Sequence, residues 1–158
     1  MSRGPLEPLI HDHEGKNPLD EPFAVLLQIA TYERLAEKAK EHRRIREADE
    51  LREHARFYRA GHDVCDDQHS LLFVLLEILD THGIQPFQGF FQEIEDHDES
   101  IIGDGGTLQR YEDYCFYLSK HANANLSPIF RSRGFKISRD VETKIKNLLR
   151  SIDYTRRG

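Results

Sequence analysis

The chain lacks long apolar runs and has few cysteines. Its one segment that is apolar on every side covers residues 71–79, far fewer than the roughly 20 residues that a membrane-spanning helix needs. The residues that follow Met1 include no apolar core of a secretory signal. Cys65 and Cys115 lie far apart and match no zinc-binding spacing. We therefore expect a cytoplasmic protein with reduced thiols and no membrane partner.

Catalytic motifs are missing as well. The sequence contains no nucleophilic triad pattern, no Walker-type motif and no glycine-rich phosphate loop that follows a strand. Its one glycine-rich run, residues 103–106, is typical of a linker loop. These absences favour a non-enzymatic role and point to no particular cofactor.

The composition favours amphipathic helices. Of the 158 residues, 38% are apolar and 32% are charged, a balance that suits helices with one buried and one solvated face. The segment 71–79 holds eight apolar residues and Glu77, so it is predicted to be the centre of the core. We expect an all-α fold, a single-domain helical bundle of about five helices around this segment. Residues 1–19 are predicted to be an irregular arm, and residues 20–158 the helical domain.

Capping residues and breaks divide the domain into helices. A first helix is predicted to begin near Asp20, and two antiparallel helices are predicted to meet at a break near residues 42–46. Phenylalanines at helical spacing predict a short helix over residues 86–97. Ser138 is expected to cap the last helix, and residues 129–137 leave room for a short extended piece before it.

Charge is divided unevenly along the chain. Residues 131–158 hold nine basic and three acidic residues, a local net charge of +6. Since the whole chain carries −6, residues 1–130 carry −12. A basic end on an acidic body predicts that the end binds an anionic partner or docks on the body. The candidate partner-binding residues are Arg131, Arg133, Lys136, Arg139, Lys144, Lys146, Arg150, Arg156 and Arg157.

A polar cluster just before the apolar segment is a candidate metal site. If one helix runs unbroken through Gly61, three of its side chains fall within about 60° on one face, and a cysteine lies at the edge of that face. This spacing suits a transition metal such as iron or zinc in a helical bundle, and His121 is available as a further ligand. The candidate ligands in the cluster are His62, Cys65, Asp66 and His69.

The same cluster has a second interpretation. If Gly61 ends the helix, Asp63 is placed to cap the next helix, and Asp66 and Asp67 complement the positive end of its dipole. His69 is then a hydrogen-bonded, partly buried histidine. The two interpretations differ only in whether the chain breaks at Gly61.

Residues 66–73 resemble the helix segment of bacterial hemerythrins in which Asp-x-Gln-His precedes Leu-Phe. The resemblance covers eight residues and implies a helical bundle with a di-iron centre, in which His69 is an iron ligand. Hemerythrins continue with a His-x-x-x-Glu pair. Here the next long predicted helix carries His121, followed four residues later by Asn125.

Arg56 and His62, separated by five residues, resemble the Arg–His pair of small helical ribonucleases of the HEPN class. The resemblance implies that His62 acts as a general acid–base on a ribose 2′-hydroxyl and that Arg56 stabilises phosphate charge. Phe57 stands where that class has a polar residue just after the arginine. The basic C-terminal segment would suit an RNA substrate.

Three functions are therefore open on sequence alone. The leading interpretation is a non-enzymatic interaction or regulatory module that binds a protein partner, a second copy of itself or a nucleic acid through its segregated charge. The alternatives are a metal-binding helical bundle and a helical ribonuclease.

Overall fold

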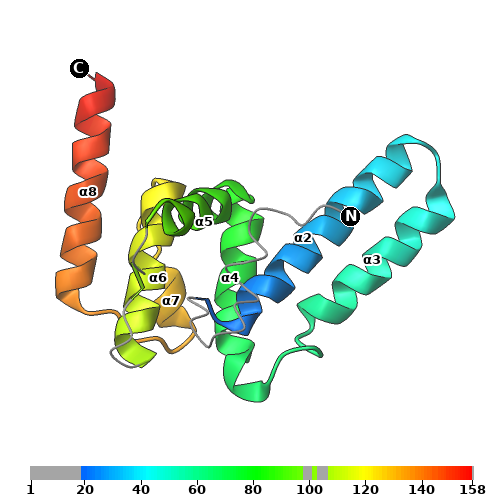
Figure 1. Ribbon diagram of the computed structural model, residues 1–158, viewed down its shortest axis with the longest axis horizontal. Helices are drawn as coiled ribbons and strands as arrows, with labels where there is room; N and C mark the ends of the chain where they lie inside the picture. The colour runs from blue at the N-terminus through cyan, green and yellow to red at the C-terminus, as the bar shows by residue number, and fades with distance from the viewer. Residues whose placement is uncertain (1–18, 98–100, 103–106, 158) are drawn as a thin grey trace. The chain divides into compact units, whose positions relative to one another are not determined.

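The computed structural model describes residues 19–97, 101–102 and 107–157. Within these ranges the chain forms seven α-helices and one 3₁₀ turn and has no β-strand, so the all-α prediction is confirmed (Figure 1). None of the helices described is long and apolar enough to cross a bilayer. The predicted N-terminal arm lies, up to residue 18, outside the described residues.

Backbone contacts group the chain into two compact units, which divide between Leu76 and Glu77. The division falls inside α4 (His69–His82). The first unit also holds α2 (Glu21–Glu41), α3 (Ile45–Arg59) and the 3₁₀ turn η1 (Asp66–Gln68). The second also holds α5 (Gln85–Asp96), α6 (Thr107–Ala122), α7 (Ser127–Ser132) and α8 (Arg139–Arg157). There are thus more helices than the five expected, and the most extensive pairs are α2 with α3, α5 with α6 and α6 with α8.

Helices α2 and α3 form an antiparallel hairpin (Figure 1). Asp20 precedes α2, as predicted, although its side chain makes no capping hydrogen bond. Pro22 lies in the first turn, where its missing N–H leaves no helical hydrogen bond unmade. The break between the two helices falls at residues 42–44, inside the predicted range.

The turn at the end of α2 is a Schellman arrangement. The N–H of Arg44 donates to the carbonyl of Ala39 at 2.8 Å, and the N–H of Arg43 donates to that of Lys40 at 3.0 Å. These two hydrogen bonds satisfy the last carbonyls of the helix. Arg43 has a left-handed φ of 61°, which is the conformation that glycine usually supplies at this position.

The seam of the hairpin is built from small side chains. Small residues allow two helix axes to approach closely. On one edge of the seam, Arg59 pairs with Glu33 at 2.9 Å, and Arg52 lies 3.8 Å from Glu37. The second half of α2 and all of α3 bury alanines alone, each at most 6% exposed, namely Ala36, Ala39, Ala48 and Ala55.

Aromatic rings gather beside this seam. Tyr32 of α2 stacks between His54 and Tyr58 of α3, with ring centroids 5.3 and 5.8 Å away. Phe57 meets Tyr58 edge-on at 5.4 Å and stacks on His62 at 5.0 Å. Ring contacts and ion pairs therefore join α2 to α3 beside the buried alanines.

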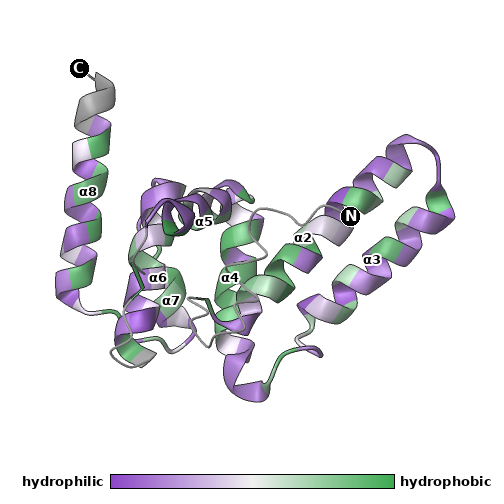
Figure 2. Cartoon of the chain, viewed as in Figure 1, coloured by the Kyte–Doolittle hydropathy of each residue, from purple (hydrophilic) through white to green (hydrophobic). Residues whose placement is uncertain are grey.

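Hydropathy separates α4 from the other helices (Figure 2). Between residues 71 and 78, six of its apolar side chains are at most 6% exposed, as the sequence predicts for this segment. In contrast, α3 buries only Ala48 and Ala55. Burial of large apolar side chains therefore stabilises α4 strongly, whereas α3 depends on its partner helix.

Helices α5 and α6 pack through aromatic side chains. Phe87, Phe90 and Phe91 of α5, which were predicted to form one helical face, are 0% exposed, as is Tyr114 of α6. Phe90 meets Tyr114 edge-on at 6.2 Å and stacks on Tyr117 at 6.0 Å. Each fully buried ring removes roughly 150–250 Å² from water, so a few residues supply most of this contact.

Helix α6 also packs against α8. The predicted cap of α8 is present, because the Ser138 Oγ accepts the Val141 N–H at 3.3 Å. Ile145 of α8 is 0% exposed. Residues 129–137 were predicted to leave room for a short extended piece. Residues 129–132 belong to α7 (Ser127–Ser132), with Pro128 in its first turn, so only the residues after them leave that room.

Candidate functional site

Gly61 ends the helical hairpin. α3 stops two residues before it, and Gly61 has a φ of 85°, which glycine adopts without strain. The next helical residues begin at η1, with Cys65 at its N-cap position. The unbroken helix that the metal arrangement requires is therefore not formed. Asp63 was also wrongly predicted to be the N-cap. Asp66 and Asp67 lie in η1, which runs directly into α4, and not in the first turn of α4 itself.

His69 closes the break that Gly61 makes. Its Nε2 lies 2.9 Å from the carbonyl oxygens of both Gly61 and Val64. Carbonyl oxygens only accept, so Nε2 carries a hydrogen and donates to both. The ring also fills the space of the missing side chain, since a Cβ added to Gly61 would lie 3.2 Å from Nε2. His69 therefore has a structural role that occupies the nitrogen most often used for a metal.

The other proposed metal ligands do not gather around His69. His62 and Cys65 are exposed. Asp66 is fully exposed, and its Oδ1 lies 3.9 Å from the His69 Nε2. In the part of the chain that the structure describes, no three His, Cys, Asp or Glu side chains are placed to hold a metal ion. These residues therefore do not form the set of iron ligands that the resemblance to hemerythrins implies.

The proposed ribonuclease pair is not joined by a contact. The Arg56 guanidinium donates to the Glu53 carboxylate one turn earlier on α3. The His62 ring stacks on Phe57. Both side chains are exposed, and no hydrogen bond links them to each other. Such a pair would have to be assembled by a substrate.

A polar cluster that the sequence did not predict joins α5 to α6, and it includes His121. The carboxylate of Glu93, 15% exposed, accepts hydrogen bonds from the Lys120 Nζ at 2.5 Å and from the His121 Nε2 at 2.6 Å. Burial alone would raise the pKa of Glu93, but the two hydrogen bonds and the charges of their donors outweigh it and lower this pKa. His121 therefore binds Glu93 rather than a cluster with His69.

Gly89 makes room for the histidine of this cluster. A Cβ at Gly89 would lie 2.4 Å from the His121 Nδ1, closer than any side chain can approach. Glycine weakens a helix interior, yet Gly89 stands in the middle of α5. A glycine inside an apolar helical pattern was the one sequence signal that could have revealed this close contact.

Arg131, a predicted partner-binding residue, is used inside the fold. Its guanidinium donates to the Glu142 carboxylate at 3.1 Å and to the Ile137 carbonyl at 2.7 Å. Asn125 donates to the other oxygen of Glu142 at 3.1 Å. The hydrogen bonds from Asn125 and Arg131 lower the pKa of Glu142. Arg131 therefore fastens the first turn of α8 and is not a free cation.

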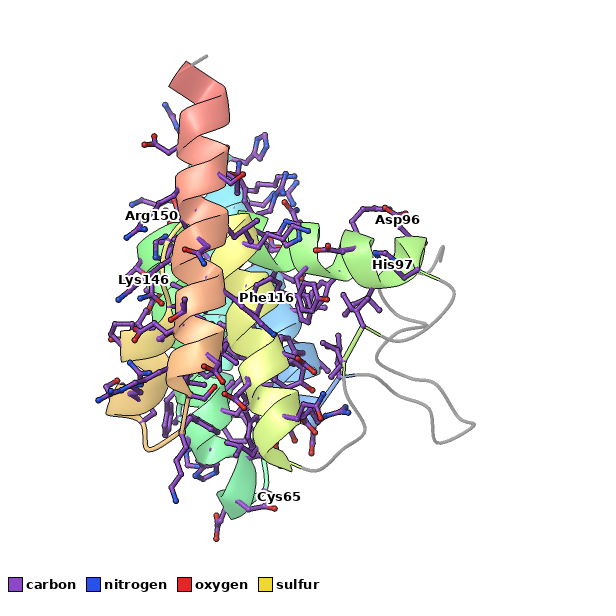
Figure 3. All side chains as sticks on the ribbon, turned by 90° about the vertical axis from the view of Figure 1, so that its left-hand side faces the viewer. Cys65, Asp96, His97, Phe116, Lys146 and Arg150 are labelled. Atoms are coloured by element: carbon purple, nitrogen blue, oxygen red, sulfur yellow. The ribbon has the colours of Figure 1, made fainter. Side chains whose placement is uncertain are left out.

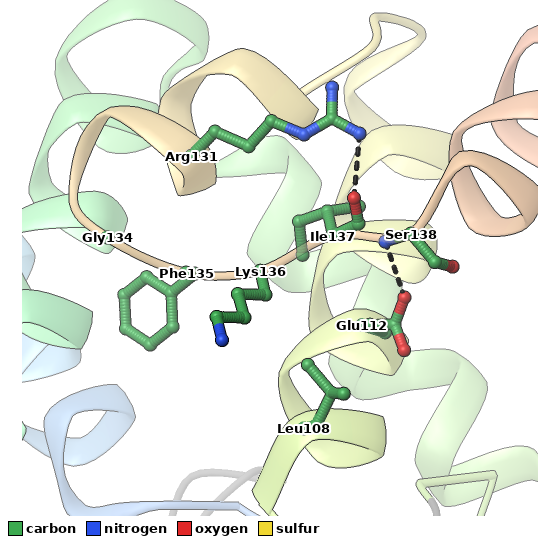
Figure 4. Close-up of a pocket in the computed structure, with 8 residues that line it drawn as sticks. All are labelled: Leu108, Glu112, Arg131, Gly134, Phe135, Lys136, Ile137 and Ser138. Carbon is green, nitrogen blue, oxygen red and sulfur yellow. Dashed lines mark hydrogen bonds between the residues drawn. The ribbon is translucent and has the colours of Figure 1, made fainter.

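An open groove of about 460 Å³ lies beside this fastening (Figure 4). Glu112 on its wall accepts the Ser138 backbone N–H at 2.8 Å, and Lys136 is exposed. With one carboxylate already hydrogen-bonded and no imidazole or thiol, the groove contains no catalytic set. Its lining residues are Leu108, Glu112, Arg131, Gly134, Phe135, Lys136, Ile137 and Ser138.

Exposed cations follow one side of α8. At 100° per residue, Arg139, Lys146 and Arg150 fall within about 40° of one another, and Lys144 lies on a different side. All four are exposed, and within the described ranges none has an ion-pair partner. Figure 3 shows the Lys146 and Arg150 side chains leaving the helix on the same side.

The remaining predicted cations are less defined. Arg133 is exposed just before the helix, and the side chains of Arg156 and Arg157 lie outside the described residues. The acidic charge is concentrated in one part of the sequence. Residues 60–130 contain thirteen acidic residues and only two basic ones, Arg110 and Lys120, whereas residues 19–59 contain nine residues of each charge.

The opposite side of α8 is apolar and only partly covered. Ile145 is fully buried, whereas Leu148, Leu149 and Ile152 are half-buried. The most extensive contact of α8 is with α6. The last turns of α8 extend past the end of α6 (Figures 1 and 3). One projecting helix thus presents both cations and apolar side chains.

Comparison of the chain with protein-family models, curated proteins and solved structures gives no match. Function is therefore inferred from the site itself. The fold and the site define an all-α protein whose distinctive surface is a basic, amphipathic C-terminal helix.

Proposed function

We propose that this chain is an interaction module that binds a protein partner through α8. The observation that carries the proposal is one projecting helix that combines half-buried apolar side chains with cations that have no ion-pair partner among the described residues. A nucleic acid would need only the cations. Leu148, Leu149 and Ile152 continue the i, i+3, i+4, i+7 spacing that starts at the buried Ile145, a spacing typical of helices that lie in a groove of a partner protein.

Charge indicates which surface such a partner offers. The cations Arg139, Lys146 and Arg150 lie away from the apolar residues and are nearest to Leu149, so the matching groove is expected to have an acidic rim on the Leu149 edge. Complementary charge mainly raises the association rate and makes it depend on salt. A second copy of the chain supplies acidic surface between residues 60 and 130, which makes self-association the first case to measure.

Site-specific crosslinking tests this proposal. A photo-reactive amino acid is placed at Leu148 or, as a control, at the exposed Asn147. The crosslinked protein, whether a second copy or another chain, is identified and purified. Its affinity is then measured against wild type, Leu149→Asp/Ile152→Asp and the charge-matched control Asn147→Asp/Ser151→Asp.

We expect crosslinking from Leu148 and a loss of affinity of about tenfold or more in Leu149→Asp/Ile152→Asp, because a charge in an apolar groove is costly. The control variant should change affinity less than about threefold. Equal crosslinking from both positions, or full affinity in Leu149→Asp/Ile152→Asp, contradicts the proposal. Loss of nucleic-acid binding in Lys146→Gln/Arg150→Gln, with no protein crosslink, would assign the helix to a nucleic-acid partner instead.

A further inference from the structure

The free end of the α2–α3 hairpin carries a second concentration of positive charge, which we call the hairpin tip (residues 38–46). Its single acidic residue is Glu41. Within the described part of the chain only Arg44 has an ion-pair partner, the exposed Glu47 at 3.6 Å. The exposed basic residues of the tip are Lys38, Lys40, Arg43, Arg44 and Arg46.

The rest of the hairpin has the opposite charge. Arg59 pairs with Glu33, Arg52 with Glu37 and Asp49, and Arg56 with Glu53. Residues 19–59 carry nine charges of each sign, so the net charge of +4 at the tip is balanced by a net charge of −4 on the rest of the hairpin. The hairpin therefore concentrates its positive potential at one end.

The tip also keeps a strained residue. Arg43 has a φ of 61° at the position where helices usually end on glycine. A side chain with a Cβ is strained in this conformation, and strained residues persist where the surrounding structure or the function requires them. Arg43 has no ion pair or side-chain hydrogen bond within the described residues that would account for an arginine here.

We propose that the hairpin tip binds the phosphate backbone of a nucleic-acid duplex. Arginine side chains are planar forks that match phosphate oxygens, and three of the five tip cations are arginines. Ile45, 57% exposed between Arg44 and Arg46, offers an apolar contact to the sugar edge. The tip contains no Phe or Tyr to stack on unpaired bases. The proposed contacts of its cations are with phosphates, which position a protein on a duplex without reading its sequence.

The tip suits a lipid surface less well. Ile45 is its only exposed apolar side chain, and membrane anchors that rely on a small apolar group and a few cations bind only weakly. An acidic protein surface also suits the tip less well, because its carboxylates do not repeat at regular intervals that would match five cations spread over two helix ends. A duplex presents phosphates at regular intervals along both strands.

Fluorescence anisotropy with the full chain tests this proposal. The probe is a labelled 20-base-pair duplex, made as DNA and as RNA, at salt concentrations from 50 to 200 mM. The variants are Arg43→Gln/Arg44→Gln/Arg46→Gln and the control Gln28→Glu/Arg34→Gln/Arg56→Gln, which removes the same three units of charge from exposed positions away from the tip. Vesicles of a neutral lipid with 30% anionic lipid provide the second arm.

We expect the wild type and the control to bind the duplex with similar affinity. The tip variant should lose about tenfold or more at 50 mM salt, and the slope of log K against log salt should fall in magnitude by about 2.7, because three phosphate contacts are lost. Equal losses in the tip variant and the control, or no duplex binding by the wild type at 50 mM salt, would overturn the proposal. Loss of vesicle binding without loss of duplex binding would overturn it as well.

Arg43→Gly separates binding from stability. Glycine relieves the left-handed strain, so we expect the melting temperature to rise by about 2–4 °C, while duplex affinity falls. A variant that is stabilised and binds as tightly as the wild type would remove Arg43 from the site. The proposal for α8 is tested independently, since Lys146→Gln/Arg150→Gln leaves the hairpin tip intact.

Discussion

The two main helix pairs of the molecule are held together in opposite ways. Between α2 and α3 the shared buried residues are alanines, and ion pairs such as Glu33–Arg59 join the edges. Between α5 and α6 they are rings, with Phe87, Phe90 and Tyr114 fully buried. An alanine seam buries little apolar area and brings backbones close, whereas an aromatic seam buries a large area through few side chains.

This difference shows how stability can be distributed over a helical pair. In α5 and α6 it is concentrated in a few rings, so single deletions should be severe. In the hairpin, stability is spread over many small contributions. The hairpin should therefore tolerate the truncation of a side chain better than the introduction of a larger one. A hairpin of this kind can also carry charge at its end, because the tip contributes little to the packing.

The largest expected effect is that of Phe90→Ala. Removal of a fully buried ring should lower the free energy of unfolding by about 3–5 kcal/mol, measured by urea denaturation. Phe57→Ala is the control, since Phe57 is 53% exposed on the hairpin and should cost about 1 kcal/mol or less. Equal costs for the two variants would show that the ring of Phe90 is not specially important.

An intermediate effect is expected for Ala48→Leu. Ala48 is 0% exposed in the hairpin seam, so three added carbons must push the helices apart and should cost about 1–3 kcal/mol. Glu50→Leu on the exposed side of the same helix is the control and should be nearly neutral. If Ala48→Leu is neutral in the same urea titration, the seam has more room than its burial indicates.

The smallest effect concerns the polar contacts of the two pairs. Glu93→Gln should cost about 1–2 kcal/mol at pH 7, because two hydrogen bonds to a charged, mostly buried carboxylate are weakened. Arg52→Gln, which removes an exposed ion pair of the hairpin, should cost about 0.5 kcal/mol or less.

The pH dependence sharpens this prediction. The folded protein lowers the pKa of Glu93, so the stabilisation by its carboxylate is complete above the usual value of 4.5 and disappears as the pH falls through the folded pKa. The stability gap between wild type and Glu93→Gln should therefore close in acid. A gap of constant size from pH 7 to acid denaturation would contradict the lowered pKa.

The sequence predicts where the helices of this fold lie along the chain better than it predicts which side of each helix is buried. The phenylalanines of α5 and the break near residues 42–46 were found because periodicity and a charged interruption are local signals. In α2 the large apolar Leu35 is 45% exposed, whereas the neighbouring Ala36 is buried. Hydrophobic patterns favour large side chains, so they do not reveal a seam that is made of alanines.

Candidate sites depend on contacts between distant residues, which explains why they were harder to predict. Arg131 was counted as a free cation because its bonds to Glu142 and the Ile137 carbonyl exist only after α7 and α8 have packed. The pair Glu93–His121 joins residues that are 28 positions apart. The sequence identified Gly61 as the position that decides whether one helix continues into the polar cluster, and in the structure the helix is broken there.

Two glycines described above each share their space with an imidazole. His69 fills the position of a Cβ on Gly61, and His121 fills that of a Cβ on Gly89. In any related sequence, a larger residue at either glycine would force its histidine to move or to be replaced. Each glycine and its histidine should therefore be inherited together, and this paired substitution pattern would identify distant relatives of the fold even where the surface helices have diverged.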